Sequence, residues 1–444
     1  MNALKRNHRK TVKIRSLILL FLGMSFLLLS PIASGEESTP SSSVNGKGIQ
    51  LEVRSAILLE VSTGQILYQS NADVAYPPAS MSKMMTEYIV LDEIKNGRLS
   101  WEDTVVASQN AQDTGGSKVF LAAGDKHTVR QLFTAMAVGS ANDATVALAE
   151  HISGTQEAFA KKMNETAIRL KLSTAHFINA TGLGRSDMKI QDRPQSIEGE
   201  TVMSARDAAI LALAIQQEHP DFFEISSLPS FQFRQRDEKP IINYNWMLEG
   251  NKDVPSLRSF AYQGLDGMKT GYTDEAGYCF TGTAVRDGVR LISVVMGTSS
   301  ESERFVETRK LLDYGFNRFE LKTVLPGKSQ IETLKTLKVS KGKQKEVTLE
   351  TANDLKFIVE KGTTPKLEIK AEPLDKSKLV APVKQGTILA TATVTYKNEN
   401  AEINVATVNL VSSNDIEKAH WFRLLLQSIG NFLISFFKEI VGLF

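Results

Sequence analysis

The chain of 444 residues contains a single cysteine, and this scarcity sets a first limit on its chemistry. Cys279 cannot form an intrachain disulfide, and its place in the strand-like stretch GYCFTGTAV favours a small core residue over a reactive thiol. Histidine is also scarce, because the six copies are scattered and none has the spacing of metal ligands. We therefore expect no zinc site and no other cofactor.

A strong charge of one sign is missing as well. Lysine and arginine together number 52 against 50 aspartates and glutamates, which gives a formal net charge of +2. Six of the basic residues and none of the acidic ones lie within residues 1–35, so the rest of the chain carries −4. This balance supplies no basic surface for a nucleic acid, and we expect no nucleic-acid partner.

Residues 1–35 have the pattern of a secretory signal peptide. Basic residues precede the apolar run SLILLFLGMSFLLLS, and the small residues Ala33 and Gly35 are placed for cleavage after Gly35. An uncleaved N-terminal anchor is the alternative. Residues 36–45 follow as a flexible linker rich in serine. The pattern predicts a mature protein outside the cytoplasm.

Residues 46–318 predict an α+β domain. Two short apolar runs precede a largely helical stretch from residue 80 to 215, and strands return at GMKTGYT, YCFTGTAV and VRLISVVMG. The last two strands are joined through Asp287-Gly288, a strong hairpin signal. Strands at both ends with helices between them indicate one antiparallel sheet that is completed late in the sequence and carries a helical insertion.

The rest of the chain differs from this domain in pattern. Alternating apolar and polar residues with turn residues between them predict a small all-β domain over residues 319–412. In the apolar tail, 416–444, polar residues recur every four positions. They are Arg423, Gln427, Asn431, Ser435 and Glu439. Such a striped, amphipathic helix is expected to lie in the membrane surface; a helix docked on its own domain and a transmembrane span are the alternatives.

The stretch PPASMSKMMTEYIV, residues 77–90, holds the first candidate for chemistry. Its apolar residues recur at helical spacing, and positions three apart on a helix are neighbours, so Ser80 and Lys83 share a face while Ser82 points elsewhere. A serine at a helix N-terminus beside an amine suits an activated nucleophile. The motif is weak alone, because the spacing recurs at Ser186/Lys189, Ser340/Lys343 and Ser435/Lys438.

Two further motifs strengthen this candidate. S-A-N at 140–142 falls between two predicted helices, and K-T-G at 269–271 falls on a predicted strand. The chain thus has S-x-x-K, S-x-N and K-T-G in the order found in class A β-lactamases and penicillin-binding proteins. In this chemistry Ser80 attacks a carbonyl and neutral Lys83 takes its proton. Burial and a neighbouring cation such as Lys269 would lower the pKa of Lys83 into a useful range.

The other residues of the motifs have matching roles. Ser140 can relay a proton toward the leaving amine, and Asn142 can hold the substrate amide.

On the strand, Lys269 and Thr270 can bind a substrate carboxylate, and Gly271 allows a close backbone approach. The backbone N–H groups of Ser80 and Tyr272 would form the oxyanion hole.

With these motifs the chain resembles the S11 peptidase family, the low-molecular-mass penicillin-binding proteins that act as serine-type D-alanyl-D-alanine carboxypeptidases. It is similar above all to the vegetative enzymes of Gram-positive bacilli. The stretches ASMSKMMTEY, INATGL and DGMKTGYTDEAGYCFTGTA carry the resemblance, which covers nearly the whole chain.

The resemblance implies a penicillin-recognising, β-lactamase-like serine transferase fold. It also implies removal of the terminal D-alanine from peptidoglycan pentapeptides through an acyl-serine intermediate, and covalent binding of β-lactams. It assigns Ser80 as nucleophile, Lys83 as proton acceptor and Lys269 as a substrate-binding residue, with Ser140 and Asn142 as the second motif. The β-rich domain would be a stalk above a membrane-anchoring tail.

Three other functions remain open at this point. A class A β-lactamase would need a glutamate for deacylation, but no E-x-x-L-N stretch lies between Asn142 and Lys269, and Ala141 stands where the motif has aspartate. A DD-endopeptidase that cuts peptide crosslinks would use the same residues. A non-catalytic module that binds the wall or senses penicillin would not need the lysine base.

Overall fold

A computed structural model describes residues 48–374, 379–397, 403–426, 429–430 and 433–434. The predicted signal peptide, 1–35, and the linker, 36–45, lie outside these residues. The first part of the described chain is built around a five-stranded antiparallel sheet in the order β2-β1-β11-β10-β9. Its strands are β1 (Ser55–Glu60), β2 (Ile66–Ser70), β9 (Leu265–Thr273), β10 (Gly277–Arg286) and β11 (Val289–Thr298).

The pairing of β1 with β11 confirms the prediction that one sheet is completed late in the sequence. The hairpin signal is also confirmed, because Asp287 and Gly288 join β10 to β11 with φ angles of 50° and 78°. Two residues with positive φ match the right-handed twist of the flanking strands. Strand β9 lies at the edge of the sheet, where it has a partner on one side only.

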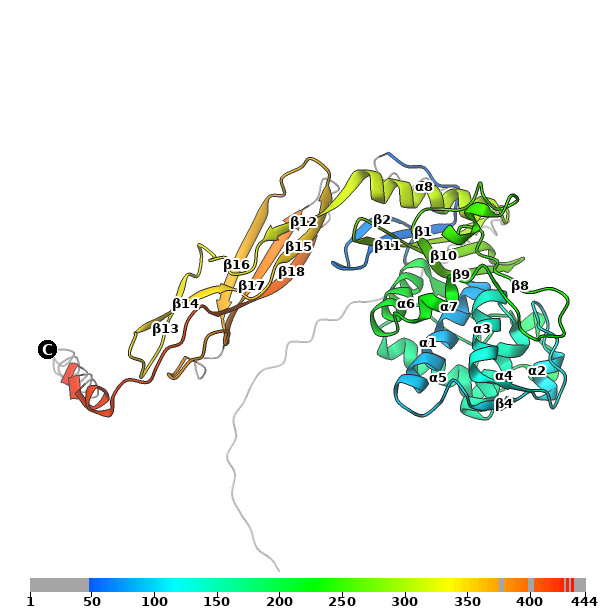
Figure 1. Ribbon diagram of the computed structural model, residues 1–444, viewed down its shortest axis with the longest axis horizontal. Coiled ribbons are helices and arrows are strands. Elements are labelled where there is room, and N and C mark those ends of the chain that lie inside the picture. The colour runs from blue at the N-terminus through cyan, green and yellow to red at the C-terminus, as the bar shows by residue number, and fades with distance from the viewer. Residues whose placement is uncertain (1–47, 375–378, 398–402, 427–428, 431–432, 435–444) are drawn as a thin grey trace, which may run out of the picture. The chain divides into compact units, whose positions relative to one another are not determined.

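Helices surround this sheet (Figure 1). They are α1 (Lys83–Lys95), α2 (Gln109–Asp113), α3 (Val129–Gly139), α4 (Asn142–Ser153), α5 (Gln156–Arg169), α6 (Ala205–Glu218), α7 (Phe222–Ser226) and α8 (Glu303–Arg318). Helix α8 covers one face of the sheet, and the other helices gather on the opposite face (Figure 1). Strand β1 shows how the layers form. Its Ile57 and Leu59 enter the core with the helical group, while Ala56 and Leu58 enter the core under α8.

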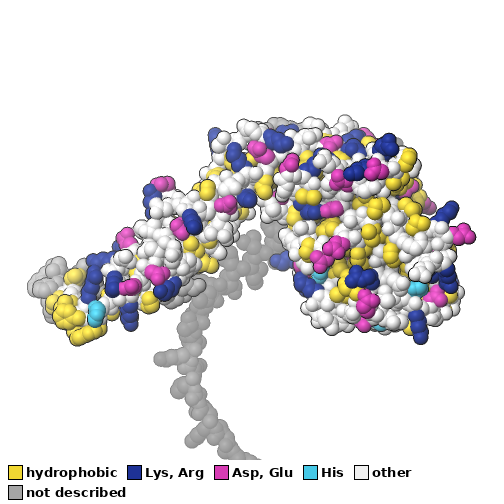
Figure 2. Space-filling view, viewed as in Figure 1, with side chains coloured by type: hydrophobic (Ala, Val, Ile, Leu, Met, Phe, Trp, Pro, Cys, Tyr) yellow, Lys and Arg dark blue, Asp and Glu magenta, His cyan; other side chains and the backbone are white. Residues whose placement is uncertain are grey.

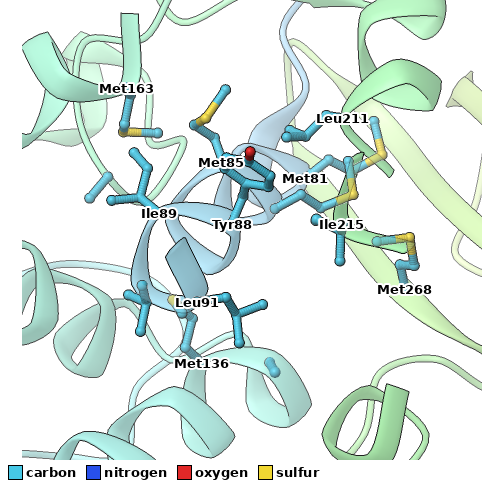
Figure 3. Packing of buried hydrophobic residues seen from close by; sticks show 14 of the residues in the cluster. Met81, Met85, Tyr88, Ile89, Leu91, Met136, Met163, Leu211, Ile215 and Met268 are labelled. Carbon is cyan, nitrogen blue, oxygen red and sulfur yellow. The ribbon is translucent and has the colours of Figure 1, made fainter. Parts of the chain in front are cut away.

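Helix α1 lies in the middle of the helical group. The sequence predicted one apolar face, but residues Lys83 to Leu91 are buried on all sides, and residues from several other elements pack around them (Figure 3). Its start also differs from the prediction, because Ser80 lies in a 3₁₀ turn, η1 (Ala79–Ser82), and the α-helix proper begins at Lys83. A helix surrounded in this way fixes the residues at its N-terminal end against the sheet.

Several short elements complete this part of the chain. Two-stranded pairs are formed by β3 (Ala75–Tyr76) with β6 (Met203–Ser204), β4 (Thr104–Val106) with β5 (Lys126–Thr128), and β7 (Ser230–Phe231) with β8 (Ile241–Ile242). The remaining 3₁₀ turns are η2 (Arg185–Asp187), η3 (Ile190–Asp192) and η4 (Glu249–Asp253).

The second part of the chain is all-β, as predicted from its alternating pattern. It forms a pair, β12-β15, and a five-stranded antiparallel sheet in the order β13-β14-β18-β17-β16. The strands are β12 (Phe319–Leu325), β13 (Thr336–Lys338), β14 (Glu346–Thr351), β15 (Leu355–Glu360), β16 (Leu367–Pro373), β17 (Ile388–Lys397) and β18 (Ile403–Ser412). This region has apolar clusters of its own, around Val347, Leu349 and Ala392.

The tail is described only in part. Residues 427–428, 431–432 and 435–444, which hold most of the predicted polar stripe, lie outside the described residues. Residues 421–426 are helical, and hydrophobic side chains gather on the surface near this end of the described chain (Figure 2). Among them, Trp421 is 69% exposed and Phe422 is 56% exposed. Within the described residues, no helix combines the length and the apolar character that crossing a membrane requires. The predicted surface helix remains a prediction.

Candidate active site

The structure brings Ser80 and Lys83 together as the helical spacing predicted. Lys83 Nζ lies 2.8 Å from Ser80 Oγ and donates a second hydrogen bond to the carbonyl oxygen of Thr181, also at 2.8 Å. Ser82 is buried elsewhere, and within the described part of the chain its hydroxyl has no hydrogen-bond partner. Of the two serines, Ser80 is therefore the one that the amine can serve.

The other matches to S-x-x-K do not form such a pair. Lys189 pairs with Asp113 at 3.2 Å, and Lys343 pairs with Glu417. Ser340 donates its hydroxyl to the carbonyl of Leu379. The match at 435–438 lies outside the described residues. Contacts between residues far apart in the sequence thus distinguish the Ser80–Lys83 pair from the other S-x-x-K matches.

The INATGL segment holds Lys83 in place. Asn179 Oδ1 accepts hydrogen bonds from the backbone N–H groups of Thr181 and Gly182, and this turn aims the Thr181 carbonyl at Lys83. Gly182 has a φ of 83°, and a Cβ there would lie 2.0 Å from the carbonyl oxygen of Ala79. A side chain at this position would therefore displace the turn that carries Ser80.

The S-x-N motif lies between α3 and α4, as predicted. Ser140 ends α3 in the left-handed conformation, with a φ of 54°, which is uncommon for a residue other than glycine and occurs often at functional sites. Asn142 begins α4 and donates through Nδ2 to the carbonyl of Gly115 at 2.7 Å. Ser140 Oγ and Asn142 Oδ1 are buried and have no partner among the described residues. The hydrogen-bonding capacity of both atoms is therefore unused within the described residues.

The loop before α4 is fixed by a buried carboxylate. Asp143 accepts hydrogen bonds from the backbone N–H groups of Val119 and Leu121, at 3.1 and 3.0 Å. Asn142 also donates its backbone N–H to the carbonyl of Ser117. These bonds place Ser117 at the site, a contribution that the sequence motifs did not reveal.

The K-T-G residues lie on the edge strand β9, as predicted. Lys269 is only 2% exposed, and Gly271 packs so closely on η1 that a Cβ would lie 2.5 Å from the carbonyl oxygen of Pro78. This contact confirms the expected close approach of the strand backbone. It brings β9 directly beside the turn that carries Ser80.

A cleft of about 300 Å³ unites the three motifs. Five of the eight predicted residues line it, and Lys83, Asn142 and Lys269 are buried. The lining residues are Ser80, Ser117, Ser140, Tyr244, Thr270, Gly271, Tyr272, Tyr278, Glu301 and Arg304.

Arg304 is the main residue that the sequence motifs missed. It is 3% exposed, pairs with Glu301 at 2.9 Å and reaches the carbonyl of Gly271, while its Nε has no partner within the described residues. In the sequence, Arg304 is one arginine near the start of the last predicted helix of the domain. This feature is too common to mark a residue as functional. Its guanidinium gives the cleft a second cation suited to carboxylates.

The electrostatics fit a lysine that acts as a base. Burial is the largest cause that lowers the pKa of Lys83 well below its ordinary value, and the charge of Lys269 lowers it further. Burial also lowers the pKa of Lys269, to about 8, and Arg304 acts in the same direction. The site therefore favours a neutral amine next to Ser80, as the sequence led us to expect.

Comparisons with known proteins agree with this geometry. Residues 39–300 match the D-alanyl-D-alanine carboxypeptidase family, peptidase S11, and residues 319–418 match the C-terminal domain of penicillin-binding protein 5. The chain is 32% identical to the D-alanyl-D-alanine carboxypeptidase DacF of Bacillus subtilis, over 94% of this chain and 98% of that protein.

Solved structures show the same relationship. Penicillin-binding protein 5 of Haemophilus influenzae is 30% identical, with a TM-score of 0.66 over 83% of this chain and 99% of that one. Penicillin-binding protein D2 of Listeria monocytogenes, solved in its ampicillin-bound form, is 33% identical, with a TM-score of 0.51 over 60% of this chain and 98% of that one. The chain therefore belongs to the S11 peptidase family of serine-type D-alanyl-D-alanine carboxypeptidases.

Proposed function

We propose that the protein removes the terminal D-alanine from peptidoglycan pentapeptides through an acyl intermediate on Ser80. The observation that carries this proposal is the fully buried amine of Lys83, 2.8 Å from Ser80 Oγ, at a cleft that Ser140 and Thr270 also line. An amine whose pKa is lowered by burial can accept the proton of a hydroxyl at neutral pH.

The reaction has two halves. Ser80 Oγ attacks the carbonyl carbon of the penultimate D-alanine while Lys83 accepts its proton. The backbone N–H groups of Ser80 and Tyr272 stabilise the oxyanion, and the proton passes by way of Ser140 to the leaving amine of D-alanine. Water then attacks the Ser80 ester and gives up a proton to Lys83. Lys83 passes this proton to Ser80 Oγ as the ester bond breaks, and the shortened peptide leaves as a carboxylic acid that ionises in solution.

The cations of the cleft would select a substrate with a free C-terminal carboxylate. Lys269 and Thr270 lie on the edge strand, and Arg304 adds a buried guanidinium on the same side of the cleft. A carboxylate bound between two cations gains charge-assisted hydrogen bonds that an amide would not make. This arrangement supports exopeptidase over endopeptidase action.

β-Lactams would bind covalently to the same serine. They carry a carboxylate and a strained amide, so Ser80 would open the ring while Lys269 and Thr270 hold the carboxylate. The relative of known structure in an ampicillin-bound form supports this proposal. Slow hydrolysis of the resulting ester would make the β-lactam an inhibitor.

We also propose where the protein works. Residues 1–35 would direct export, 36–45 would link, and 46–318 would catalyse. The all-β region, 319–412, would be a stalk, and 416–444 would attach to the outer surface of the cell membrane. Exposed apolar side chains at Trp421, Phe422 and Leu425 support the attachment.

The test is release of D-alanine from a pentapeptide that ends in D-alanyl-D-alanine. Ser80→Ala should abolish release, whereas Ser82→Ala, the matched control two residues away, should keep it. Equal activity in wild type and Ser80→Ala would overturn the proposal. No release by folded wild-type protein, together with cleavage of crosslinked dimers, would mean an endopeptidase. Penicillin labelling without any peptide cleavage would mean a binding module.

A further inference from the structure

Glu87 is a charged residue at the site to which none of the three motifs gives a role. It lies one helical turn after Lys83 on α1, so the two side chains share a face. It is completely buried, and within the described residues neither of its carboxylate oxygens has a hydrogen-bond partner. A carboxylate buried without hydrogen bonds is unfavourable unless positive charge compensates it.

The compensating charges belong to the catalytic site. The charged groups that act most strongly on Glu87 are Lys269 on β9 and then Lys83 on its own helix. Arg304 on α8 acts in turn on Lys269. Three buried ionisable groups, two lysines and one carboxyl, are thus electrostatically linked, and one of them, Lys83, contacts Ser80.

The proposed reaction needs the two lysines in opposite states. Lys83 must be neutral to accept the proton of Ser80, and Lys269 must be protonated to bind a carboxylate. Once Glu87 ionises, a cluster with neutral Lys83 and protonated Lys269 has no net charge, which is the least costly arrangement for a buried site. One carboxylate can compensate only one of the two lysines.

We propose that Glu87 is a positioning residue whose buried carboxylate keeps the proton on Lys269 while Lys83 is neutral. This inference rests on the roles proposed above for Ser80, Lys83 and Lys269. Glu87 does not line the cleft and has no hydrogen bond to Ser80 within the described residues, so it acts through Lys269.

The pH dependence follows from the signs of the pKa shifts. Burial raises the pKa of Glu87 to about 8 and lowers that of Lys269 to about 8, so the two groups titrate in the same range. Ionised Glu87 opposes the loss of the Lys269 proton as the pH rises. Without this charge, Lys269 becomes neutral at a lower pH. The charge of Glu87 raises the pKa of Lys83 in the wild type, so its removal lowers this pKa further. Lys83 then stays neutral, and its action as a base is not impaired.

The experiment measures the second-order rate constant for covalent labelling by penicillin from pH 5.5 to 10, using the full chain. In Glu87→Gln the alkaline limb should move down by about one pH unit, a loss of about tenfold at the highest pH, with little change at pH 6. Glu93→Gln is the control, since Glu93 lies on the same helix and pairs with Arg98 and Lys162 away from the cleft. Its profile should match wild type.

An unchanged midpoint of the alkaline limb in Glu87→Gln would overturn the proposal, as would a uniform loss at every pH, which a purely structural role predicts. If the glutamine variant does not fold, Glu87→Asp decides. This variant keeps the charge at a greater distance, so a smaller downward shift is expected, and a pH-independent loss would count against the proposal. Ser80→Ala separates the two hypotheses. Persistent labelling there would refute the proposed function, on which the role of Glu87 rests, whereas labelling that is lost there but keeps its alkaline limb unchanged in Glu87→Gln would refute the role of Glu87 alone.

Discussion

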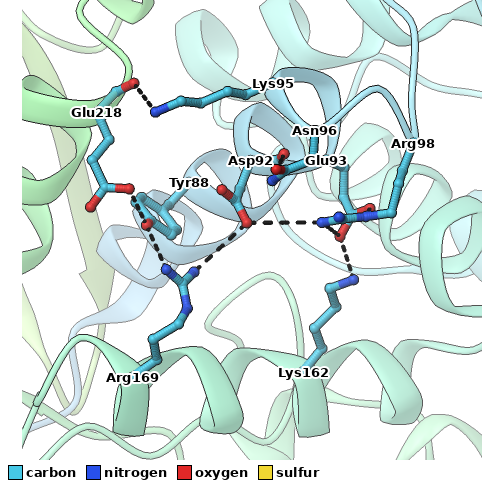
Figure 4. Close-up of polar contacts among 9 residues, drawn as sticks. All are labelled: Tyr88, Asp92, Glu93, Lys95, Asn96, Arg98, Lys162, Arg169 and Glu218. Carbon is cyan, nitrogen blue, oxygen red and sulfur yellow. Dashed lines mark hydrogen bonds and ion pairs between the residues drawn. The ribbon is translucent and has the colours of Figure 1, made fainter.

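The two ends of helix α1 both carry buried or half-buried carboxylates, but these carboxylates differ in whether they have hydrogen-bond and ion-pair partners. At the C-terminal end, Glu93 accepts from Arg98 and Lys162, and Asp92 pairs with Arg98 and Arg169 (Figure 4). At the N-terminal end, the carboxyl of Glu87 has no hydrogen-bond partner within the described residues.

The difference separates stability from chemistry. A paired charge keeps its ordinary ionised form and ties one element to another, as Glu93 ties α1 to α5. Buried lysines with few partners have shifted pKa values and can change protonation during a reaction. The C-terminal end of the helix therefore holds the fold together, and the N-terminal end carries the buried groups to which we assign the activation of Ser80.

The largest effect should come from removing the base at the N-terminal end. Lys83→Met should slow penicillin labelling by about 10³-fold or more, because Ser80 loses its proton acceptor. Its melting temperature should stay the same or rise, since methionine fills the space without the cost of burying an amine. Labelling kinetics and thermal unfolding measure the two effects. Near wild-type labelling would show that another group is the base.

The pH profile of the wild-type protein is the next test. Labelling should rise with pH as Lys83 loses its proton, and fall again as Lys269 loses its own near pH 8. Each limb should approach a tenfold change per pH unit. A rate that keeps rising above pH 9 would contradict the assignment of the carboxylate-binding cation to Lys269.

Whether the sequence alone could predict a feature of this helix depends on how far apart in the chain the interacting residues lie. The Ser80–Lys83 pair and the hairpin at Asp287 follow from local geometry, and both were confirmed. The burial of Glu87 and Arg304 could not be predicted, because it depends on elements far apart in the sequence that close around α1 and β9. A glutamate on a helix normally marks its solvent face, but every residue of α1 from Lys83 to Leu91 is buried.

A smaller effect, on stability alone, should come from the paired end. Glu93→Gln should lower the melting temperature by about 2–4 °C without changing penicillin labelling, because glutamine cannot pair with Arg98 and Lys162. The hydrogen bond from Arg98 is the largest cause that lowers the pKa of Glu93. The stability of this pairing is therefore present above the unfolded-state pKa and is lost as the pH falls through the folded-state pKa. Wild type and variant should converge in melting experiments at acidic pH, and a gap that persists there would contradict the electrostatic explanation.

The smallest effect is expected at a serine–lysine pair that has the S-x-x-K spacing but whose lysine is exposed to solvent. Lys343 follows Ser340 by three residues, as Lys83 follows Ser80, but its side chain is 57% exposed and pairs with Glu417. Water screens such a charge and the Glu417 carboxylate holds the amine, so Lys343 lacks the buried setting that Lys83 has beside Ser80. Lys343→Met should therefore leave penicillin labelling and the melting temperature unchanged, in contrast to the same substitution at Lys83. Loss of labelling in this variant would mean that spacing, and not burial, defines the reactive pair.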